Sequence, residues 1–394
     1  MLHSNYNENN PLFKGLIVKN FNLNSNNQYE AHLEMPHKEQ VCPHCGRKTA
    51  KIKDYRTQIF KDSKIFGSET YVYLRKRRYL CTFCNKSFTE NNPLIHRYQH
   101  FSSRFHKEIF KEFVSIQSFS SISKRFRVSV TSIMRWFDNV SYSLPKLPES
   151  IAIDEFRGNA GGEKFQCNLS DPVSHKVIDI LPNRTSEDLC KHFLKYTYKD
   201  RAKVKKVVMD LSTLFRSVVK TIFPEAKIIA DKFHVIRVVI NSLENVRKRI
   251  QRQFRAEKRK WFKRSRQLLL KPNYKLTPDD KIILNRILNS SPELEKAYML
   301  KEEFYKIFRK DTRNAAKKEL GDWLLLAAKL SIPEFQHCIT TFTSWRTEIA
   351  NIIGETLSNG FIEGSNNKIK VLKRISFGVQ NFDRFRNRIL HLCS

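Results

Sequence analysis

The chain has 394 residues, of which 40% are hydrophobic and 12% aromatic, so it can bury a sizeable core and does not have a disordered composition. At roughly 100–200 residues per domain, this length predicts about two to four modules. Lysine and arginine total 72 against 39 aspartates and glutamates, a formal net charge of +33. Nucleic acid explains this excess, because each phosphate contact releases condensed counterions. A plain solvated basic surface and membrane lipid are weaker explanations.

The chain shows no sign of a membrane or export signal. It has no run of about 18 apolar residues that would span a bilayer. Residues 1–10 are polar and rich in asparagine, without the basic start and apolar stretch of a signal peptide. We therefore expect a cytoplasmic, nucleoid-associated protein without a membrane partner. Disulfides are rare in that compartment, so the eight cysteines need another explanation.

Residues 1–40 are a polar N-terminal arm to which the sequence assigns no role. A few apolar positions, such as Leu16, Ile17 and Val18, allow two short strands there. Residues 41–95 form a second segment that contains two CxxC pairs. Between the pairs, the run Thr70–Leu74 is typical of a strand because it is rich in β-branched and aromatic residues.

The two CxxC pairs predict a zinc-binding module. They are Cys42 with Cys45 and Cys81 with Cys84. Such pairs can supply four thiolates to one tetrahedral zinc ion, and Gly46 suits the turn of the first pair. Because the protein would fill all four positions, the zinc would be structural. Two unrelated pairs of buried thiols and two redox motifs are the alternatives, and we interpret His44 as a bystander.

Residues 96–145 predict a helix-turn-helix. Ser120 or Ser121 would cap a first helix that contains Ile122 and Phe126, and a turn at 128–130 would precede a second helix at 131–137. Such a second helix enters the DNA major groove in many proteins. The candidate DNA contacts are Ser129, Thr131, Ser132 and Arg135. A plain three-helix bundle is the alternative, and the prolines in residues 145–149 indicate a linker.

From residue 150 the pattern becomes that of an α/β domain, in which strands alternate with helices. The expected strands are 151–156, 164–168, 176–181, 204–209 and 226–229, and the expected helices are 187–196 and 214–222. The chain then becomes helical and very basic from His234 to about residue 330, and residues 340–394 are also mainly helical.

Two aspartates stand at the ends of apolar strand segments, Asp154 after residues 151–153 and Asp210 after residues 207–209. Adjacent strands would bring these carboxylates close together, where they repel each other unless divalent cations lie between them. This arrangement is typical of two-metal phosphoryl transfer. The alternative is that each aspartate only caps the following helix. Glu155 should point to the opposite face of its strand.

Glu363 is the candidate for a third acidic ligand. In a helix at 357–374, the residues on one face would be Glu363, Asn367, Lys370 and Arg374, and those on the other face would be Ile362, Ile369 and Leu372. One carboxylate would then lie beside Lys370 and Arg374, which could hold DNA phosphates. Glu355 and Asp322 are alternatives whose surroundings fit less well.

Asp231 and His234 form a further pair just after the strand at 226–229. A histidine can transfer protons or contact phosphate near neutral pH. A buried histidine with satisfied hydrogen bonds is equally consistent with these residues.

Taken together, these motifs resemble bacterial insertion-sequence transposases of the ISL-three (L-three) family, which are of the DDE type. The resemblance begins near Val41 and includes CPHCG with CTFC, IDEF, VVMDLS, ADKFHV and SNGFIEGSNNKIKVLKR followed by NFDRFRNRIL. It implies an RNase H-like core interrupted by an all-helical insertion. The core would comprise residues 150–235 and 341–394, and the insertion residues 236–340.

The resemblance also implies that Asp154, Asp210 and Glu363 bind two Mg²⁺ or Mn²⁺ ions, and that Asp231 and His234 take part in catalysis. We expect hydrolysis at the element ends and attack of the freed 3′-hydroxyl on target DNA. The partners would be the terminal inverted repeats, target DNA and at least one more protomer. Two other functions stay open at this stage. They are a zinc and helix-turn-helix regulator without catalysis, and a structure-specific nuclease.

Overall fold

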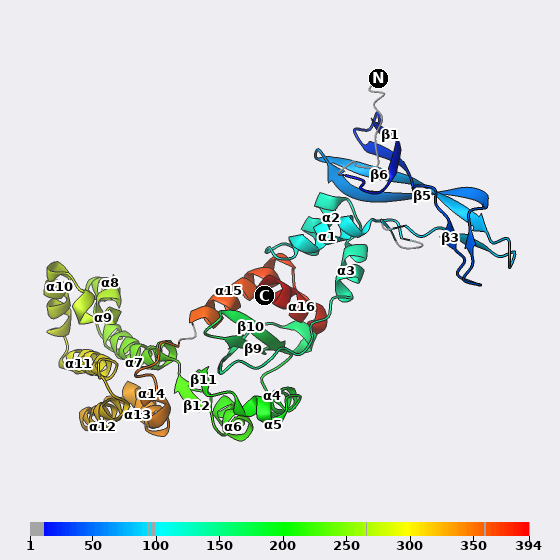
Figure 1. Cartoon of the computed structure of the whole chain (residues 1–394). Coiled ribbons are helices and arrows are strands. Elements are labelled where there is room, and N and C mark those ends of the chain that lie inside the picture. The colour runs from blue at the N-terminus through cyan, green and yellow to red at the C-terminus, as the bar shows by residue number, and fades with distance from the viewer. Residues whose placement is uncertain (1–11, 93, 96–98, 265, 358–359, 394) are drawn as a thin grey trace. The chain divides into compact units, whose positions relative to one another are not determined.

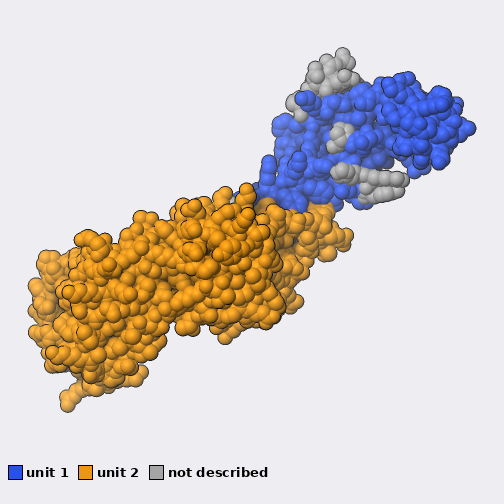
Figure 2. Space-filling view, turned by 60° about the horizontal axis from the view of Figure 1, so that its bottom comes forward, with its two compact units in different colours: residues 1–115, 120–130 blue, residues 116–119, 131–394 orange. Residues whose placement is uncertain are grey.

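The computed structural model describes residues 12–92, 94–95, 99–264, 266–357 and 360–393 (Figure 1). Residues 1–11 of the predicted N-terminal arm lie outside the described residues. The chain divides into two compact units, coloured separately in Figure 2. They comprise residues 1–115 with 120–130, and residues 116–119 with 131–394. Each unit has a hydrophobic core of its own. In the described part of the chain, no helix is long and apolar enough to cross a membrane.

A five-stranded sheet forms most of the first unit. Its strands are β1 (Ile17–Leu23), β2 (Tyr29–Glu34), β5 (Ile52–Ile65), β6 (Ser68–Leu80) and β7 (Ser87–Thr89). The order is β1-β2-β6-β5, and β7 pairs with β6. The long hairpin of β5 and β6 is antiparallel, whereas β2 pairs with β6 in parallel. The small ribbon of β3 (Gln40–Val41) and β4 (Lys48–Thr49) precedes this hairpin.

This sheet is larger than the sequence predicts. The expected strand at 70–74 is only the middle of β6. The two expected strands of the N-terminal arm are present as β1 and β2, and they belong to the same sheet. Ala31 and Leu33 on β2 share a core with Val72 and Leu74 on β6. The described part of the arm is therefore built into the zinc-motif segment, and does not form a separate element.

Three short helices follow, α1 (Ser103–Glu112), α2 (Phe119–Phe126) and α3 (Val130–Asp138). The helix α2 begins at Phe119, so the predicted capping residues Ser120 and Ser121 lie inside its first turn. The prediction of the cap is wrong because the helix begins earlier, and Ser118 occupies the preceding position, where serine is favoured. The two helices of the predicted motif, α2 and α3, are both present.

A mixed five-stranded sheet forms the centre of the second unit. Its strands are β8 (Ser150–Phe156), β9 (Gln166–Asp171), β10 (Lys176–Leu181), β11 (Lys206–Met209) and β12 (Lys227–Ala230). They lie in the order β10-β9-β8-β11-β12. The strands β8, β11 and β12 are parallel, and β9 is antiparallel to both β8 and β10. All five strands fall within a few residues of the expected ranges.

The helices between these strands are α4 (Ser186–Phe193), α5 (Tyr198–Ala202) and α6 (Thr213–Ile222). Each begins after a hydroxyl residue whose side chain accepts a hydrogen bond from the backbone three residues ahead. These caps are Thr185, Thr197 and Ser212. Such caps stabilise a helix start by roughly 1 kcal/mol, because they satisfy an otherwise free backbone N–H group. The short helix α5 was not predicted.

The second half of the chain is helical, as expected. Its helices are α7 (Lys232–Arg252), α8 (Ala256–Arg264), α9 (Arg266–Leu270), α10 (Pro278–Leu288), α11 (Pro292–Ile307), α12 (Arg313–Leu330), α13 (Gln336–Ser344), α14 (Arg346–Ala350), α15 (Gly360–Ile375) and α16 (Phe382–Cys393). Short 3-10 turns lie at Ala160–Gly162, Asn273–Lys275 and Pro333–Phe335. One hydrophobic cluster runs from the sheet, at Ile153 and Val208, into the helices, at Phe304 and Trp323. The helical segment and the sheet therefore share a core.

A substitution at Ile369 can test the packing of α15 against the sheet. Its side chain is 0% exposed and belongs to a cluster with Val177, Ile180 and Phe385. We expect Ile369→Ala to lower the free energy of unfolding of the second unit by about 2–4 kcal/mol, because it leaves a cavity. Val371→Ala is the control, since Val371 on the same helix is 43% exposed and should change stability by less than about 0.5 kcal/mol. Equal losses in urea unfolding of the two variants would contradict this packing.

Candidate active site and metal centre

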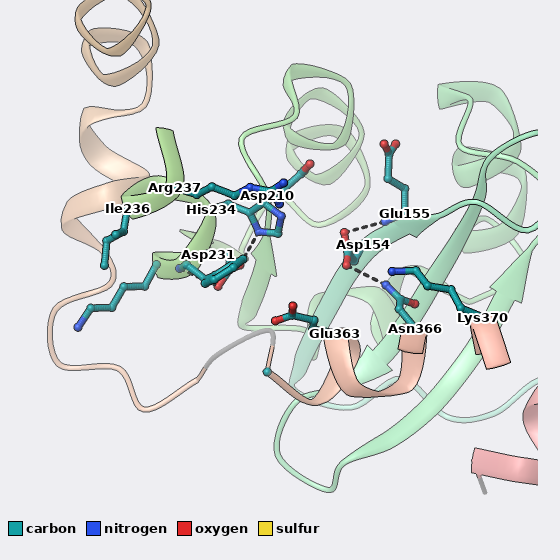
Figure 3. Close-up of a pocket in the computed structure, with 13 residues that line it drawn as sticks. Asp154, Glu155, Asp210, Asp231, His234, Ile236, Arg237, Glu363, Asn366 and Lys370 are labelled. Atoms are coloured by element: carbon teal, nitrogen blue, oxygen red, sulfur yellow. Dashed lines mark hydrogen bonds and ion pairs between the residues drawn. The ribbon is translucent and has the colours of Figure 1, made fainter. Parts of the chain in front are cut away.

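Three aspartates lie at one level of the second sheet because three neighbouring parallel strands are in register. Met209 on β11 pairs with Ile153 on β8 and with Ala230 on β12. The next residues along the three strands are Asp154, Asp210 and Asp231. Since the carboxyl ends of parallel strands meet at the same edge of a sheet, these side chains converge there (Figure 3).

Asp154 occupies a more rigid position than the sequence indicated. The strand β8 does not end at Asp154 but continues to Phe156, paired with β9. Only the parallel pairing with β11 stops before it. Asp154 is therefore inside a strand, at the point where one neighbouring strand ends and opens its side chain to the pocket.

Burial makes the two candidate metal ligands on the strands costly to ionise. It raises the pKa of Asp154 to about 6, although the backbone N–H of Glu155 and the nearby His234 lower it. Burial also raises the pKa of Asp210. The Oδ1 atom of Asp210 is buried and has no hydrogen-bond partner among the described residues. An unpartnered buried carboxylate oxygen is expensive, so this edge of the sheet needs positive charge.

Asp231 and His234 form a hydrogen-bonded pair beside these two acids. Asp231 is 4% exposed, and its side chain caps α7 by accepting from the backbone N–H of Phe233. Its Oδ2 atom lies 2.6 Å from Nδ1 of His234. This hydrogen bond is the main cause of a raised pKa of His234, and the charges of Asp154 and Asp210 raise it further. These contacts favour the protonated form of the imidazole more than in a free histidine, whereas its burial opposes that form.

The helix α15 brings residues from the end of the chain to the same place. Glu363 and Lys370 on its exposed face line the pocket, and Ile362, Ile369 and Leu372 are buried, as the predicted helical face requires. Figure 3 shows the Glu363 carboxylate pointing from α15 into the space beside Asp154 and Asp231.

Asn366 fixes the helix α15 to the sheet. Its Nδ2 atom donates to Oδ2 of Asp154 at 2.9 Å, and its Oδ1 atom accepts from Nδ2 of Asn168 on β9 at 2.8 Å. Asn168 also contacts Ser365 and accepts from Ser170. These four polar residues are at most 4% exposed. A fully connected buried network of this kind favours one arrangement, because any shift leaves polar atoms unsatisfied.

The pocket that these residues line has a volume of about 610 Å³. Besides the predicted acids, His234 and Lys370, its lining includes Asn366, Lys232 and Arg237, which the sequence analysis missed. Arg237 could have been found, since it follows His234 by three residues and so shares its face of α7. Asn366 could not, because its role depends on the pairing with β9.

The carboxylates of the pocket are of the ligand type that divalent cations prefer. Oxygen ligands from Asp154, Asp210 and Glu363 suit Mg²⁺ or Mn²⁺, and the unpartnered Oδ1 atom of Asp210 is a free ligand atom. Among the described residues, however, these three acids do not form a group whose ligand atoms all lie within 4.8 Å of one another. They share a pocket without forming a compact ligand sphere in this structure.

The alternative acids lie elsewhere or have other partners. Glu355 bonds to Lys206 and Lys227, at the opposite ends of β11 and β12 from the pocket. Asp322 is exposed on α12. Glu155 was expected on the opposite face, but it does line the pocket, and it pairs with Arg184.

Two residues predicted beside Glu363 do not line the pocket, namely Asn367 and Arg374. Both are exposed on α15. The pocket side of α15 is defined by Glu363, Asn366 and Lys370, so it is rotated toward Asn366 relative to the predicted face, and Asn367 points to solvent. Arg374 therefore remains a candidate DNA contact outside the pocket.

The four paired cysteines of the first unit form a compact group. Their Sγ atoms all lie within 4.8 Å of one another, so they could hold one metal ion. The two pairs have matching turns, in which Gly46 N–H donates to Cys42 O and Asn85 N–H donates to Cys81 O, each at 2.9 Å. Gly46 and Asn85 have φ angles of 74° and 53°, a conformation that glycine and asparagine adopt most readily. His44 is exposed beside the group and is not part of it.

The helix α3 presents the predicted DNA contacts to solvent. Ser129, Thr131 and Arg135 are exposed and Ser132 is partly exposed. Ile133 and Phe137 on the opposite face are fully buried. Thr131, Ser132 and Arg135 therefore lie away from the packed face of α3, and Ser129 directly precedes the helix.

The fold and these sites define a modular protein with a cysteine cluster, a helix pair and an α/β core that carries an acidic pocket. Comparison with known families assigns each part. Residues 151–389 match the ISL3 transposase family, residues 38–84 match the zinc-finger of transposases IS204/IS1001/IS1096/IS1165, and residues 90–141 match the helix-turn-helix domain of transposase family ISL3. The chain therefore belongs to the ISL3 family of DDE transposases. The resemblance and the fold class expected from the sequence are confirmed.

Individual relatives agree with this family. The chain is 22% identical over 362 residues to the transposase for insertion sequence element IS1001 of Bordetella parapertussis, a match that covers 90% of this chain and 89% of that protein. It is 29% identical over 241 residues to the transposase for IS1557 of Mycobacterium tuberculosis, covering 55% and 54% of the two chains. A match of 34% identity to a Lactococcus lactis protein described as an ATP-dependent protease covers only 27% of this chain and 33% of that protein.

The buried acids give a prediction about stability. We expect Asp210→Asn to raise the melting temperature of the EDTA-treated protein, because it removes a charge whose burial is unfavourable. A gain of about 1 kcal/mol corresponds to about 2–4 °C for a unit of this size. Because the folded-state pKa of Asp210 is raised, protonation also relieves this cost, so the gain should shrink as the pH falls from 7 to 4.

Added Mg²⁺ should reverse the order of the two melting temperatures, since a ligand stabilises the folded state that binds it. Wild-type protein should gain more in melting temperature than Asp210→Asn. Asp322→Asn, on the exposed side of α12, should behave as the wild type does. An unchanged melting temperature of Asp210→Asn in EDTA, together with an equal response to Mg²⁺, would show that Asp210 is not an unpaired metal ligand.

Proposed function

We propose that this transposase binds the terminal inverted repeats of its own insertion sequence and carries out metal-dependent strand cleavage and strand transfer there. The proposal depends on one observation: Asp154 and Asp210, from neighbouring strands, line the same pocket as Glu363. Hydrolysis would break the bond between phosphorus and the 3′-oxygen at each element end. The freed 3′-hydroxyl would then attack a phosphodiester of the target DNA, forming a new bond to phosphorus while the bond to the target's own 3′-oxygen breaks and leaves a 3′-hydroxyl.

Asp154, Asp210 and Glu363 would hold two divalent ions, with Mg²⁺ or Mn²⁺ as the natural choice for carboxylate ligands. Bound there, the ions would activate the attacking oxygen and stabilise the charge that develops on the leaving oxygen. The two aspartates stand on rigid strands. The hydrogen bond between Asn366 and Asp154 sets the position of the helix that carries Glu363.

His234 and Asp231 would act on the reacting DNA. When protonated, the imidazole, oriented by Asp231 at 2.6 Å, would donate a hydrogen bond to a phosphate oxygen or a proton to the departing 3′-oxygen. Lys370 and Arg237, at the same pocket, would hold neighbouring phosphates. The helix α3 and the cysteine module would recognise the repeats. Since two ends must be cut and joined, we infer a homodimer or larger assembly on DNA.

The ion in the cysteine group would be zinc with a structural role, because four thiolates leave no open position for chemistry. We expect purified protein to contain about one zinc per chain. Cys45→Ser should reduce that content several-fold and lower the melting temperature of the first unit, since metal binding is coupled to folding. Cys190→Ser, a cysteine on α4 outside the group, is the control. Full zinc content in Cys45→Ser would reject the four-thiolate site.

The proposed activity can be tested with duplex DNA that carries the repeats flanking the gene. In Mg²⁺, wild-type protein should nick this DNA and join a pre-cleaved 3′-end to a target plasmid. Asp154→Asn, Asp210→Asn and Glu363→Gln should each reduce both reactions by at least about a hundredfold, since each removes charge stabilisation that is largest in the transition state. DNA affinity without metal should stay within a few-fold of wild type. Asp322→Asn is the matched control.

The outcomes separate the competing functions. A regulator that only binds DNA would give no products with any variant or with the wild type. A structure-specific nuclease would cut, yet fail to join the pre-cleaved end. Loss of activity in Asp322→Asn to the same degree as in Asp210→Asn would show that the acids act through folding and not through chemistry.

A further inference from the structure

The helix α7 runs from the acidic pocket to a second pocket in the same unit. At its N-terminal end, His234 and Arg237 line the pocket of the acids. At its C-terminal end, Lys248 and Gln251 line a pocket of about 570 Å³ together with residues of α8. The helices α7 and α8 contact each other (Figure 1). One continuous helix therefore connects the two pockets.

The exposed cations of this second pocket form a surface that we call the basic corner. Its members are Lys248 on α7 and Arg259, Lys260 and Lys263 on α8. The three residues of α8 share one side of the helix, because they are three and four positions apart. The rest of the lining consists of Arg247, Gln251, Phe254 and Ala256. No acidic side chain therefore lines this pocket in the part of the chain that the structure describes.

Aromatic packing fixes α8 against the end of α7. Phe262 on α8 is 0% exposed, and its ring lies edge-on to that of Phe254, with the ring centroids 5.1 Å apart. Phe262 belongs to the main hydrophobic cluster of the second unit, and Phe254 packs against that cluster. The helix α8 therefore holds its exposed cations at a defined place beside Lys248.

Acidic side chains compensate little of the charge in this region. Glu244 on α7 is 7% exposed, and its carboxylate bonds to Arg247 at 2.8 Å and to Arg266 at 3.2 Å. Lys248 lies 3.8 Å from the same carboxylate, and its side chain is 54% exposed. One negative charge thus lies near three positive charges. Glu257 on α8 does not line the pocket and has no ion pair among the described residues.

The three cations of α8 contribute nothing visible to the fold. Arg259, Lys260 and Lys263 have no ion pair or side-chain hydrogen bond among the described residues. By contrast, Arg249 on α7 pairs with Glu293 on α11 at 2.5 Å and so joins two helices. Like charges three and four residues apart on a helix repel each other, so the cluster weakens α8. A polyanionic ligand explains the cluster, whereas stability does not.

We propose that the basic corner binds the sugar–phosphate backbone of the DNA whose end reacts in the acidic pocket. Lysine and arginine side chains donate charge-assisted hydrogen bonds to phosphate oxygens, and these contacts position DNA without reading its sequence. The inference rests on the proposed function, because it takes the acidic pocket as the place of the reaction. It assigns to α7 and α8 a positioning role that the helix-turn-helix does not supply.

The helix α7 also sets where on the DNA this contact falls. Arg237 and Lys248 are eleven positions apart on α7, which is about three helical turns, so they point to the same side. At a rise of 1.5 Å per residue, they lie about 16 Å apart along the helix axis. A duplex that lies along α7 rises about 3.4 Å per base pair, so the basic corner contacts phosphates about five base pairs from the acidic pocket.

The test uses full-length Lys260→Gln/Lys263→Gln protein without divalent ions. The probes are a duplex with the repeats flanking the gene and a random duplex of equal length. Loss of two phosphate contacts should reduce the slope of log affinity against log salt by about 1.8, so the wild type should lose about tenfold more affinity than the variant between 50 and 200 mM salt. The change should be equal on both duplexes, because phosphate contacts carry no sequence information.

Lys317→Gln/Lys318→Gln is the matched control. It removes two exposed lysines from α12, neither of which lines the pocket of the basic corner. This control should keep the wild-type slope, and both double variants should keep the wild-type melting temperature.

Neutral methylphosphonates at single positions locate the contact on the repeat duplex. Those about four to six base pairs from the terminal base pair of the repeat, where we expect the cut, should weaken binding of the wild type and leave Lys260→Gln/Lys263→Gln unaffected. Sensitive positions more than about ten base pairs away would contradict the placement of DNA along α7.

Equal slopes for the wild type and Lys260→Gln/Lys263→Gln would overturn the proposal, as would an equal change in the control. A loss confined to the duplex with the repeats would indicate base recognition and also overturn it. The measurement is independent of catalysis. A slope change in a protein that neither cuts nor joins DNA would refute the proposed strand transfer and support binding of DNA by the basic corner. An unchanged slope in an active transposase would refute the basic corner alone.

Discussion

The candidate active site depends on one constraint, namely that like-charged carboxylates are held together by backbone register. Met209 pairs with both Ile153 and Ala230, so the residues that follow on three strands must emerge at one level. The apolar strands beneath supply the core that makes this arrangement stable. Repulsion and burial then raise the pKa of Asp154 and Asp210. The nearby His234, which lowers both pKa values, and the donor group of Asn366 offset this cost only in part, which leaves the site suited to cations.

The helix α15 brings residues from near the end of the chain to the strand residue Asp154. Asn366 contacts Asp154 across 212 residues of sequence, and most of the intervening chain is the helical segment. Because this segment shares a core with the sheet, it does not act as a loose loop whose closure would cost entropy. The buried network of Asn168, Ser365 and Asn366 then selects one position of α15. Glu363, one turn from Asn366, is placed by that network.

The sequence alone predicted those features that depend on local pattern. Asp154 and Asp210 follow short apolar runs, and the burial of Ile362 and Ile369 follows from helical spacing. The missed features depend on pairing between distant segments. The parallel pairing of β2 with β6 brings residues 29–34 into the first sheet, and nothing near β2 in the sequence indicates that partner. Asn366 was overlooked for the same reason, since its value lies in contacts with β8 and β9, and its neighbour Asn367 fitted the helical face equally well.

The distribution of charge explains how one chain can combine an acidic pocket with a polyanionic substrate. The acids of the pocket would repel DNA if they were its first point of contact. The whole chain carries 72 lysines and arginines, and three of them, Lys232, Arg237 and Lys370, line the pocket together with the acids. Attraction to phosphate would therefore come from residues that need no metal, whereas the buried carboxylates would need the proposed cations to offset their charge. On the proposed function, this separation would make binding of DNA independent of the ions, and only the chemistry would depend on them.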